Sequence, residues 1–234
     1  MGVRYERWLI ARGNTFSPAA ASVVKLVEKL RKEGWIGDSG AYAVKTVENT
    51  FGADQAKRLA AGSEAMPATL TKDWLEDPER EELRLVWRAV KYPLNLAPEG
   101  EVTCSLEVHR CLEYVYPSAD NIDAVPSVCR CGEDLAFEWD DEELVPAFAA
   151  STGIFAECEE CSRTFEPSKG TATITNPFDG TKEEVAGGAA YRFAIKVDCG
   201  KSFVKDGKLA FAPELVALME AEFGRQFYEV GCSR

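Results

Sequence analysis

The sequence predicts an α+β fold that forms a single domain over residues 1–234, and three observations lead to this prediction. A strand followed by a helix opens the chain, several segments with alternating apolar residues come after it, and only two strong amphipathic helices are present. Alternation with a period of two is typical of strands that bury one face. Because so few helices cannot cover both faces of a doubly wound sheet, we expect a mostly antiparallel sheet with two main helices.

The opening strand is predicted at residues 3–11, and a helix follows it. Within the strand, Arg7 and Leu9 lie on one side of the pleat, whereas Trp8 and Ile10 lie on the other. Strand and helix together form the βα unit that opens the chain.

The first helix is predicted between Ser17, an expected N-cap, and Gly34, an expected C-cap. Pro18 occupies the first helical position, where its missing N–H is not needed. Apolar residues then recur at helical spacing, namely Val23, Val24, Val27 and Leu30.

The remaining elements are predicted from alternation, helical spacing and turn residues. Further strands are expected at 41–50, 83–92, 105–116, 191–197 and 227–230. Short helices are expected at 54–61 and 142–150, a loop at 67–79, a turn at 176–180, and a last amphipathic helix from Pro213 to Gly224.

The composition excludes several classes of protein. Of the 234 residues, 46% are apolar, which is enough to bury a core without disulfides and excludes a disordered or fibrous chain. The net charge of −12 argues against nucleic acid or anionic lipid as the main partner, because such contacts depend on Lys and Arg. The single histidine excludes any site that needs two imidazoles.

The N-terminal residues place charges inside their only short apolar run, so no secretory signal is expected. The longest nearly uncharged stretch, 144–156, is shorter than the about 20 apolar residues that span a bilayer. We therefore expect a cytoplasmic protein without a membrane partner, whose eight cysteines are metal ligands or buried side chains rather than disulfides. Cys104, Cys199 and Cys232 are expected to be buried, with Cys199 and Cys232 as the pair that could lie close together.

Charge is distributed unevenly along the chain. Residues 1–60 contain ten Lys and Arg against six acids, whereas residues 132–162, which we call the acidic segment, contain ten acids and no base. Four of these acids are consecutive: Asp140, Asp141, Glu142 and Glu143. They suit either the first turn of a helix, where acids favour the helix dipole, or a surface for a basic partner.

Four cysteines have the spacing of metal ligands. Two close pairs, separated by 26 residues, are formed by Cys129 with Cys131 and by Cys158 with Cys161. This spacing predicts a tetrahedral structural zinc site, and residues 127–167 resemble a zinc ribbon, an embedded subdomain. Gly132 follows the first pair where such a turn favours positive φ.

The pattern departs from the usual ribbon at two places, since the first pair is C-x-C and Ser162 replaces the glycine expected after the second. The alternatives are reduced, metal-free cysteines or a redox disulfide. The redox alternative is the weaker one, because neighbouring acids would raise the pKa of the thiols: Glu157, Glu159 and Glu160.

Two weaker motifs bear on catalysis. His109 and Cys111 share one side of a predicted strand with Glu107 and Glu113, in the manner of a nucleophile, a base and an orienting carboxylate. We expect a solvated strand face instead, because neighbours two apart on a strand diverge. The Gly-Lys-Ser at 200–202 lacks the first glycine of a phosphate-binding loop.

These observations favour a non-enzymatic protein that binds a basic protein partner through its acidic segment, an inhibitor or immunity protein for a basic toxin being one form. No catalytic residue and no small-molecule substrate are predicted. One alternative is an enzyme that uses a pair of carboxylates as acid and base in a cleft of the sheet. A less favoured alternative is a zinc-ribbon nucleic-acid module that uses the basic residues of the first part of the chain: Arg4, Arg7, Lys25, Lys29, Arg31 and Lys32.

Overall fold

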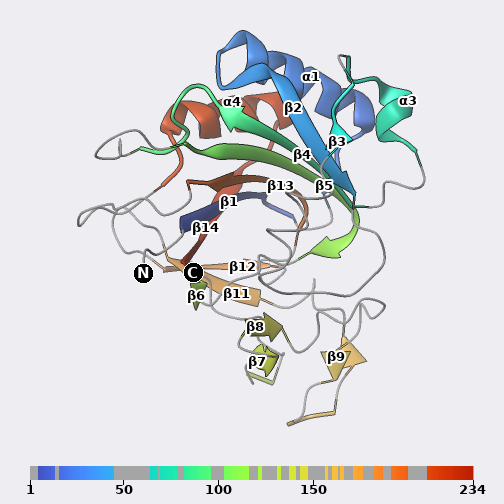
Figure 1. Ribbon diagram of the computed structural model, residues 1–234. Helices are drawn as coiled ribbons and strands as arrows, with labels where there is room; N and C mark the ends of the chain where they lie inside the picture. The colour runs from blue at the N-terminus through green and yellow to red at the C-terminus, as the bar shows by residue number, and fades with distance from the viewer. Residues whose placement is uncertain are drawn as a thin grey trace.

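The computed structural model describes residues 5–13, 16–44, 64–67, 69–77, 82–95, 103–115, 121–122, 131–132, 137–140, 143–146, 156–157, 160–162, 164–165, 171–175, 182–186, 191–199 and 210–233. Over these residues the predicted α+β fold is confirmed. The chain opens with β1 (Tyr5–Ala11) and α1 (Ala20–Lys32), and an antiparallel sheet forms the body of the molecule (Figure 1).

The main sheet has the strand order β3-β2-β4-β5-β13-β1-β14-β6, and all neighbouring strands are antiparallel. The first strand therefore lies near the middle of the sheet, between two strands from the end of the chain. The bounds of the strands not yet given are β2 (Ile36–Val44), β3 (Glu64–Ala65), β4 (Glu82–Ala89), β5 (Ser105–Val115), β6 (Asn121–Ile122), β13 (Tyr191–Asp198) and β14 (Phe227–Ser233).

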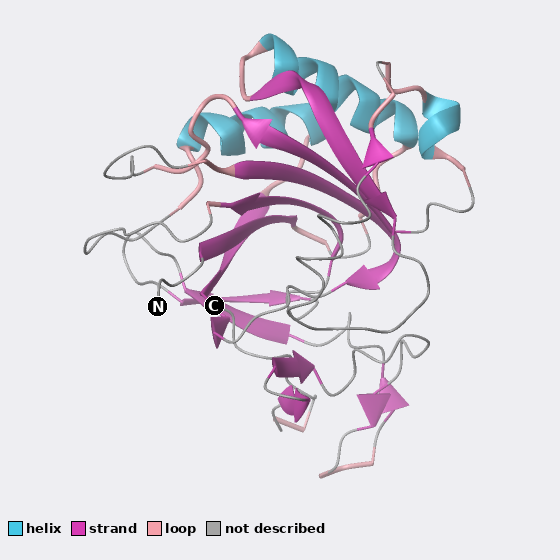
Figure 2. Cartoon of the chain, viewed as in Figure 1, coloured by secondary structure: helices cyan, strands magenta, loops and turns pink. Residues whose placement is uncertain are grey.

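The helices α1, α3 (Lys72–Leu75) and α4 (Pro213–Phe223) all lie on one face of the curved sheet (Figure 2). The hydrophobic core fills the space between this helix face and the helices. Side chains at alternate positions of the strands enter it, including Leu83, Leu85 and Trp87 from β4 and Leu106 and Val108 from β5. No helix in the described part of the chain is long and apolar enough to cross a membrane.

The first helix begins later than predicted, because its N-cap is Ala19 and not Ser17. Residues 16–19 precede the helix, and the ring of Phe16 packs edge-on against Phe193 and Phe223 at the core, with ring centroids 5.8 and 5.5 Å apart. Burial of an aromatic ring outweighs a capping hydrogen bond of about 1 kcal/mol. The C-terminal end is as predicted, since Gly34 has a φ of 77°.

The last helix matches its prediction at both ends. Pro213 begins α4, and Gly224 ends it in the left-handed conformation. The strands predicted at 83–92, 105–116, 191–197 and 227–230 are present as β4, β5, β13 and β14, although β4 ends already at Ala89 and β14 continues to Ser233.

Three further predictions need correction. Strand β2 starts at Ile36 rather than at residue 41. The loop predicted at 67–79 contains α3, whose N-cap Thr71 accepts a hydrogen bond from the backbone N–H of Trp74 at 3.2 Å. The helix predicted at 142–150 is wrong, because β8 (Glu143–Pro146) pairs there with β7 (Phe137–Asp140).

Two further hairpins complete the described elements. β9 (Ala156–Glu157) pairs with β10 (Thr164–Phe165), and β11 (Thr171–Thr175) pairs with β12 (Lys182–Ala186). In Figure 1 the hairpins β7–β8 and β9–β10 lie on the side of the sheet away from the helices. The helix predicted at 54–61 and the turn predicted at 176–180 lie outside the described residues.

Candidate functional site

The face of the sheet opposite the helices carries a buried polar network. Glu6 on β1, Glu107 on β5 and Lys196 on β13 are only 3%, 5% and 8% exposed. His109 on β5 is also buried, at 2%. Charged side chains are rarely buried to this extent unless they are paired, so their partners define what this network can do.

Lys196 lies between two carboxylates. Its Nζ is 2.9 Å from Oε1 of Glu6 and 3.9 Å from Oε1 of Glu107. The register explains this arrangement, since Lys196 on β13 is directly opposite Glu107 on β5 and Trp8 on β1. The ammonium also lies 5.2 Å from the centroid of the Trp8 ring. One lysine therefore neutralises charge from the strands on both sides of it.

His109 makes a hydrogen bond through each of its ring nitrogens. Nε2 lies 2.9 Å from Oε2 of Glu107, and Nδ1 lies 2.9 Å from the hydroxyl of Tyr191 on β13. An ionised carboxylate can only accept, so we assign the proton of the neutral ring to Nε2. The Tyr191 hydroxyl then donates to Nδ1, and the three side chains form a continuous hydrogen-bonded chain.

The charges of Glu107 and His109 depend on their burial and on the groups around them. Burial alone would raise the pKa of Glu107, but the Lys196 ammonium and the hydrogen bond from His109 outweigh it and hold that pKa far below its usual range. Burial lowers the pKa of His109, against the opposing effect of the hydrogen bond to Glu107. At neutral pH the carboxylate is therefore charged and the imidazole is neutral.

This geometry corrects the expectation of a solvated, diverging strand face. Glu107 and His109 are two residues apart on one strand, yet their side chains meet, because the imidazole is long enough to reach the neighbouring carboxylate. Cys111 is buried on the same strand. The chemistry available to the network is the holding of a proton between Tyr191, His109 and Glu107.

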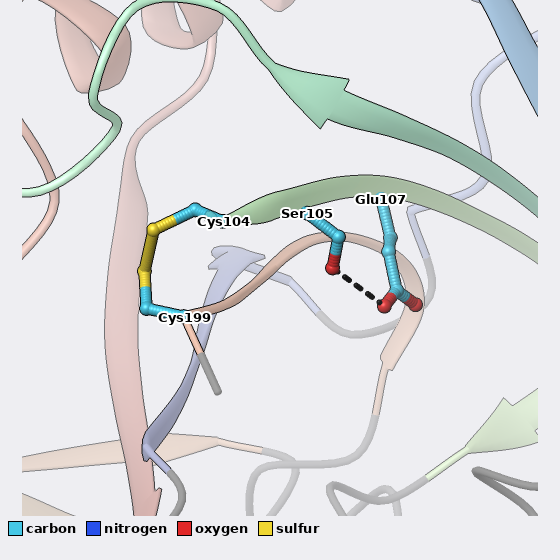
Figure 3. Close-up of a disulfide and its surroundings, with 4 residues drawn as sticks. All are labelled: Cys104, Ser105, Glu107 and Cys199. Carbon is cyan, nitrogen blue, oxygen red and sulfur yellow. Dashed lines mark hydrogen bonds between the residues drawn. A yellow bond between two sulfur atoms is a disulfide. The ribbon is translucent and has the colours of Figure 1, made fainter. Parts of the chain in front are cut away.

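A disulfide joins Cys104 to Cys199 at one end of the β5–β13 strand pair, on the core side of the sheet (Figure 3). The expectation that both are buried is confirmed, at 3% each, but the expectation that the chain uses no disulfide is wrong. Cys199 also bonds to Cys104 and not to Cys232. The cause is the register: Ser105 and Asp198 are paired across β5 and β13, so the cysteines just beyond them face one another.

Figure 3 shows Ser105 and Glu107, which follow Cys104 on β5; the two cysteines themselves belong to the core on the other side of the sheet. Ser105, which follows Cys104, places its Oγ 3.4 Å from Oε1 of Glu107, on the same side of β5. A sequence signal for the bond was present, because Cys104 directly precedes one predicted strand and Cys199 closely follows another. Pairing these two predicted strands antiparallel, with the start of one opposite the end of the other, would have predicted that the two cysteines are neighbours.

The four ligand-spaced cysteines are described only in part. Cys131 is exposed and Cys161 is partly exposed, whereas Cys129 and Cys158 lie outside the described residues. No cluster of three or more metal-ligating side chains occurs in the part of the chain that is described. Zinc binding by the four cysteines therefore stays a prediction.

The backbone after each cysteine pair has the left-handed conformation. Gly132 has a φ of 96° and Ser162 a φ of 52°, and each directly follows the last cysteine of its pair. Ser162 is the only non-glycine residue with positive φ in the described ranges. Strands β9 and β10 flank the second pair, with Glu157 opposite Thr164. The positive φ expected at Gly132 is therefore present, and Ser162 adopts positive φ as well, although serine rarely does.

The acidic run does not begin a helix. Asp140 and Glu143 are cross-strand partners at the end of the β7–β8 hairpin, while Asp141 and Glu142 lie outside the described residues. Like charges on opposite strands destabilise a hairpin unless something compensates them. The alternative interpretation, a surface for a basic partner, stays a prediction.

The basic residues of the first part of the chain are partly engaged within the protein. Arg7 Nε lies 3.4 Å from Oε2 of Glu229, and Lys29 Nζ lies 3.4 Å from Oε2 of Glu222. Arg31 donates to a backbone carbonyl at 3.3 Å. Arg4 and the Gly-Lys-Ser at 200–202 lie outside the described residues.

Comparison of the chain with protein-family models, with curated proteins and with solved structures gave no match.

Proposed function

We propose that this chain is a protein-binding protein whose acidic segment, residues 132–162, docks a basic protein partner. An inhibitor or immunity protein that neutralises a basic toxin is one form of this function. The observation that carries the proposal is the contrast between two sets of charges. Those buried in the sheet have partners inside the protein, whereas the acidic segment has ten acids and no base.

The sheet network supports a structural role for its own charges. Glu6 and Glu107 both face Lys196, and His109 is hydrogen-bonded on both sides. Such compensation is what buried charges need in order to be tolerated. The Lys196 ammonium helps to hold the pKa of Glu107 far below its usual range, and a carboxylate that stays ionised suits stability better than exchange of protons with a substrate.

The acidic segment has the opposite character. The β7–β8 hairpin brings Asp140 and Glu143 opposite one another, which concentrates negative charge at one end of a small element. Repulsion of this kind is relieved when a cationic surface docks on it. A concentrated acidic surface also raises the rate of association with basic proteins and selects for them.

We further propose that one zinc ion organises this segment through Cys129, Cys131, Cys158 and Cys161. The left-handed turns at Gly132 and Ser162 support this, because a serine adopts positive φ at a cost of about 1 kcal/mol or more, which needs a compensating interaction. Bound zinc would supply a closed tetrahedral thiolate scaffold with no open position for a substrate. Four thiolates around one zinc ion add two negative charges to the acidic segment.

The test uses the full chain in its zinc-loaded form and two charge variants. In the first, the run is neutralised as Asp140→Asn, Asp141→Asn, Glu142→Gln and Glu143→Gln. The matched control removes the same charges from exposed acids elsewhere, as Asp38→Asn, Asp73→Asn, Glu28→Gln and Glu33→Gln. Each immobilised protein is exposed to a lysate of the native cell, and captured proteins are identified and then purified for binding assays.

We expect one basic protein to bind the wild type and the control with similar affinity and the first variant at least about tenfold more weakly. Absence of any basic partner, or equal weakening by both variants, would contradict the proposal.

A second candidate is an enzyme, and one observation favours it. The chain Tyr191–His109–Glu107 has the order of a proton donor, a base and an orienting carboxylate. Turnover of a small substrate that is abolished by Tyr191→Phe but unaffected by the charge variants would favour the enzyme over the binding protein.

A further inference from the structure

Strands β5 and β13 carry most of the buried polar network, and the disulfide joins these same two strands. It lies at one end of a ladder of paired residues that runs from Ser105 and Asp198 to Arg110 and Phe193. Beyond Phe193 the register shifts before Tyr191. Four network side chains belong to this strand pair: Glu107 and His109 on β5, and Tyr191 and Lys196 on β13.

We propose that the Cys104–Cys199 disulfide is a redox-sensitive link that fixes the register of β5 and β13 and so keeps His109 hydrogen-bonded between Glu107 and Tyr191. A slip of one residue between antiparallel strands turns every side chain of the shifted strand to the opposite face. The hydrogen bond between the Tyr191 hydroxyl and Nδ1 of His109 would then be lost. A covalent bond between residues at the end of the ladder opposes such a slip.

The surroundings of His109 make its proton affinity sensitive to small movements. Glu107 faces it from its own strand, Arg84 is its cross-strand partner on β4, and Tyr191 and Lys196 approach from β13. The carboxylate favours a proton on the ring, whereas the two cations and burial disfavour it. Loosening of the β5–β13 pair would admit water to the ring, and the imidazole would then take up a proton more readily.

The redox step involves a dithiol reductant. One thiolate of the reductant attacks a disulfide sulfur, which breaks the S–S bond and forms a mixed disulfide, and its second thiolate then releases the protein. Two electrons and two protons reach the protein, so Cys104 and Cys199 become thiols while the reductant becomes a disulfide. Both sulfurs are buried, so the reductant reaches them when the ends of β5 and β13 separate.

Thermodynamic linkage makes the coupling reciprocal. If closure of the disulfide lowers the proton affinity of His109, then protonation of His109 must disfavour closure by the same free energy. Acidic and reducing conditions would therefore act together on this strand pair.

The experiment exploits the fact that His109 is the only histidine in the chain. Its ring-proton NMR signal is followed against pH in the oxidised wild type, in the wild type reduced with dithiothreitol, and in the double variant Cys104→Ala/Cys199→Ala. The matched control is Cys111→Ala, which removes a buried cysteine of β5 outside the disulfide.

We expect the midpoint of the histidine titration to move upward, towards that of an unfolded chain, in the reduced protein and in the double variant. The control should keep the midpoint of the oxidised wild type. Equal midpoints in the oxidised and reduced proteins, or an equal shift in the control, would overturn the proposal. If the double variant does not fold, the reduced wild type decides. Loss of folding on reduction would also overturn it, because the bond would then hold the whole domain.

Discussion

The His109 imidazole and the Glu107 carboxylate lie 2.9 Å apart on one strand, although both are buried on a sheet face where charge is costly. The pair is possible because Lys196 stands opposite Glu107, and because Tyr191 satisfies the second ring nitrogen of His109. The single histidine of the chain is thus a built-in reporter of this face of the sheet.

The stability of the protein should fall as pH falls below about 6.5, the ordinary pKa of histidine. Because burial lowers the pKa of His109 in the folded state, the unfolded chain binds a proton in this range that the folded chain does not. The expected slope from this group is at most about 1.4 kcal/mol per pH unit. Urea unfolding of wild type and His109→Gln between about pH 5 and about pH 7 measures it.

The His109→Gln variant should lose the part of the pH dependence of stability that comes from the histidine. Glu107 contributes in the same direction at lower pH, because its pKa is also lowered in the folded state, so its contribution is present above its unfolded pKa and is lost only on further acidification. A His109→Gln protein with the same slope as wild type across this range would contradict the assignment of a neutral buried imidazole.

Replacement of Lys196 by Met should destabilise the protein by about 3–5 kcal/mol, because it leaves Glu6 and Glu107 buried without their shared counter-ion. Adding Glu6→Gln to this variant should recover part of the loss. Lys25→Met on the exposed side of α1 is the control and should change stability by less than about 0.5 kcal/mol. If urea unfolding showed the same loss of stability for Lys196→Met and Lys25→Met, the contribution of Lys196 would not come from its pairing with Glu6 and Glu107.

Gly40→Ala should destabilise the protein by about 1–3 kcal/mol. Gly40 on β2 is paired with Trp87 on β4, and an added methyl group would overlap the indole and the end of the Met66 side chain. Met66 can move aside, but Trp87 is held in the core. The control is Gly37→Ala on the same strand, where the nearest atom is at an ordinary 3.8 Å. Thermal unfolding of both variants should show a loss at position 40 alone.

Elemental analysis of the purified chain should find about one zinc ion per molecule, as a single four-cysteine site requires. Cys131→Ser and Cys161→Ser should each abolish it, and a strong chelator should remove it from the wild type. Protein prepared under reducing conditions without bound zinc would refute the prediction.

Ser162→Gly should tighten zinc binding about fivefold, because glycine adopts the observed positive φ about 1 kcal/mol more easily than serine. Ser162→Ala is the matched control and should leave the affinity within about twofold, since alanine meets the same steric barrier. Competition with a coloured chelator gives both affinities. Equal affinities of the glycine and alanine variants would mean that the turn does not belong to a metal site.

Long elements with clear periodicity were predictable from the sequence. Strands β4, β5, β13 and β14 alternate over most of their length, and α4 is bounded by Pro213 and Gly224. In each of these cases the local preference and the tertiary environment favour the same conformation. The start of α1 was not predictable, because the position of Phe16 in the core, and not the capping potential of Ser17, determines it.

The candidate sites depend on information that a single sequence does not contain. The acids at 140–143 suit the start of a helix as well as the end of a hairpin, and their partner strand decides between the two. The sequence placed His109 and Glu107 on one side of a strand but predicted that their side chains diverge, and the role of Lys196 follows from strand order, which composition does not give. The Cys104–Cys199 bond likewise follows from the pairing of two strands far apart in the chain.

The most direct test of the proposed function is the rate of association between the zinc-loaded chain and its captured basic partner as a function of salt. Docking through the acidic segment predicts that the association rate falls by at least about tenfold between low and physiological ionic strength. It also predicts that the variant neutralised at 140–143 loses most of this dependence, while the control neutralised at Glu28, Glu33, Asp38 and Asp73 retains it. An association rate that is independent of salt, or equally reduced in both variants, would contradict the account.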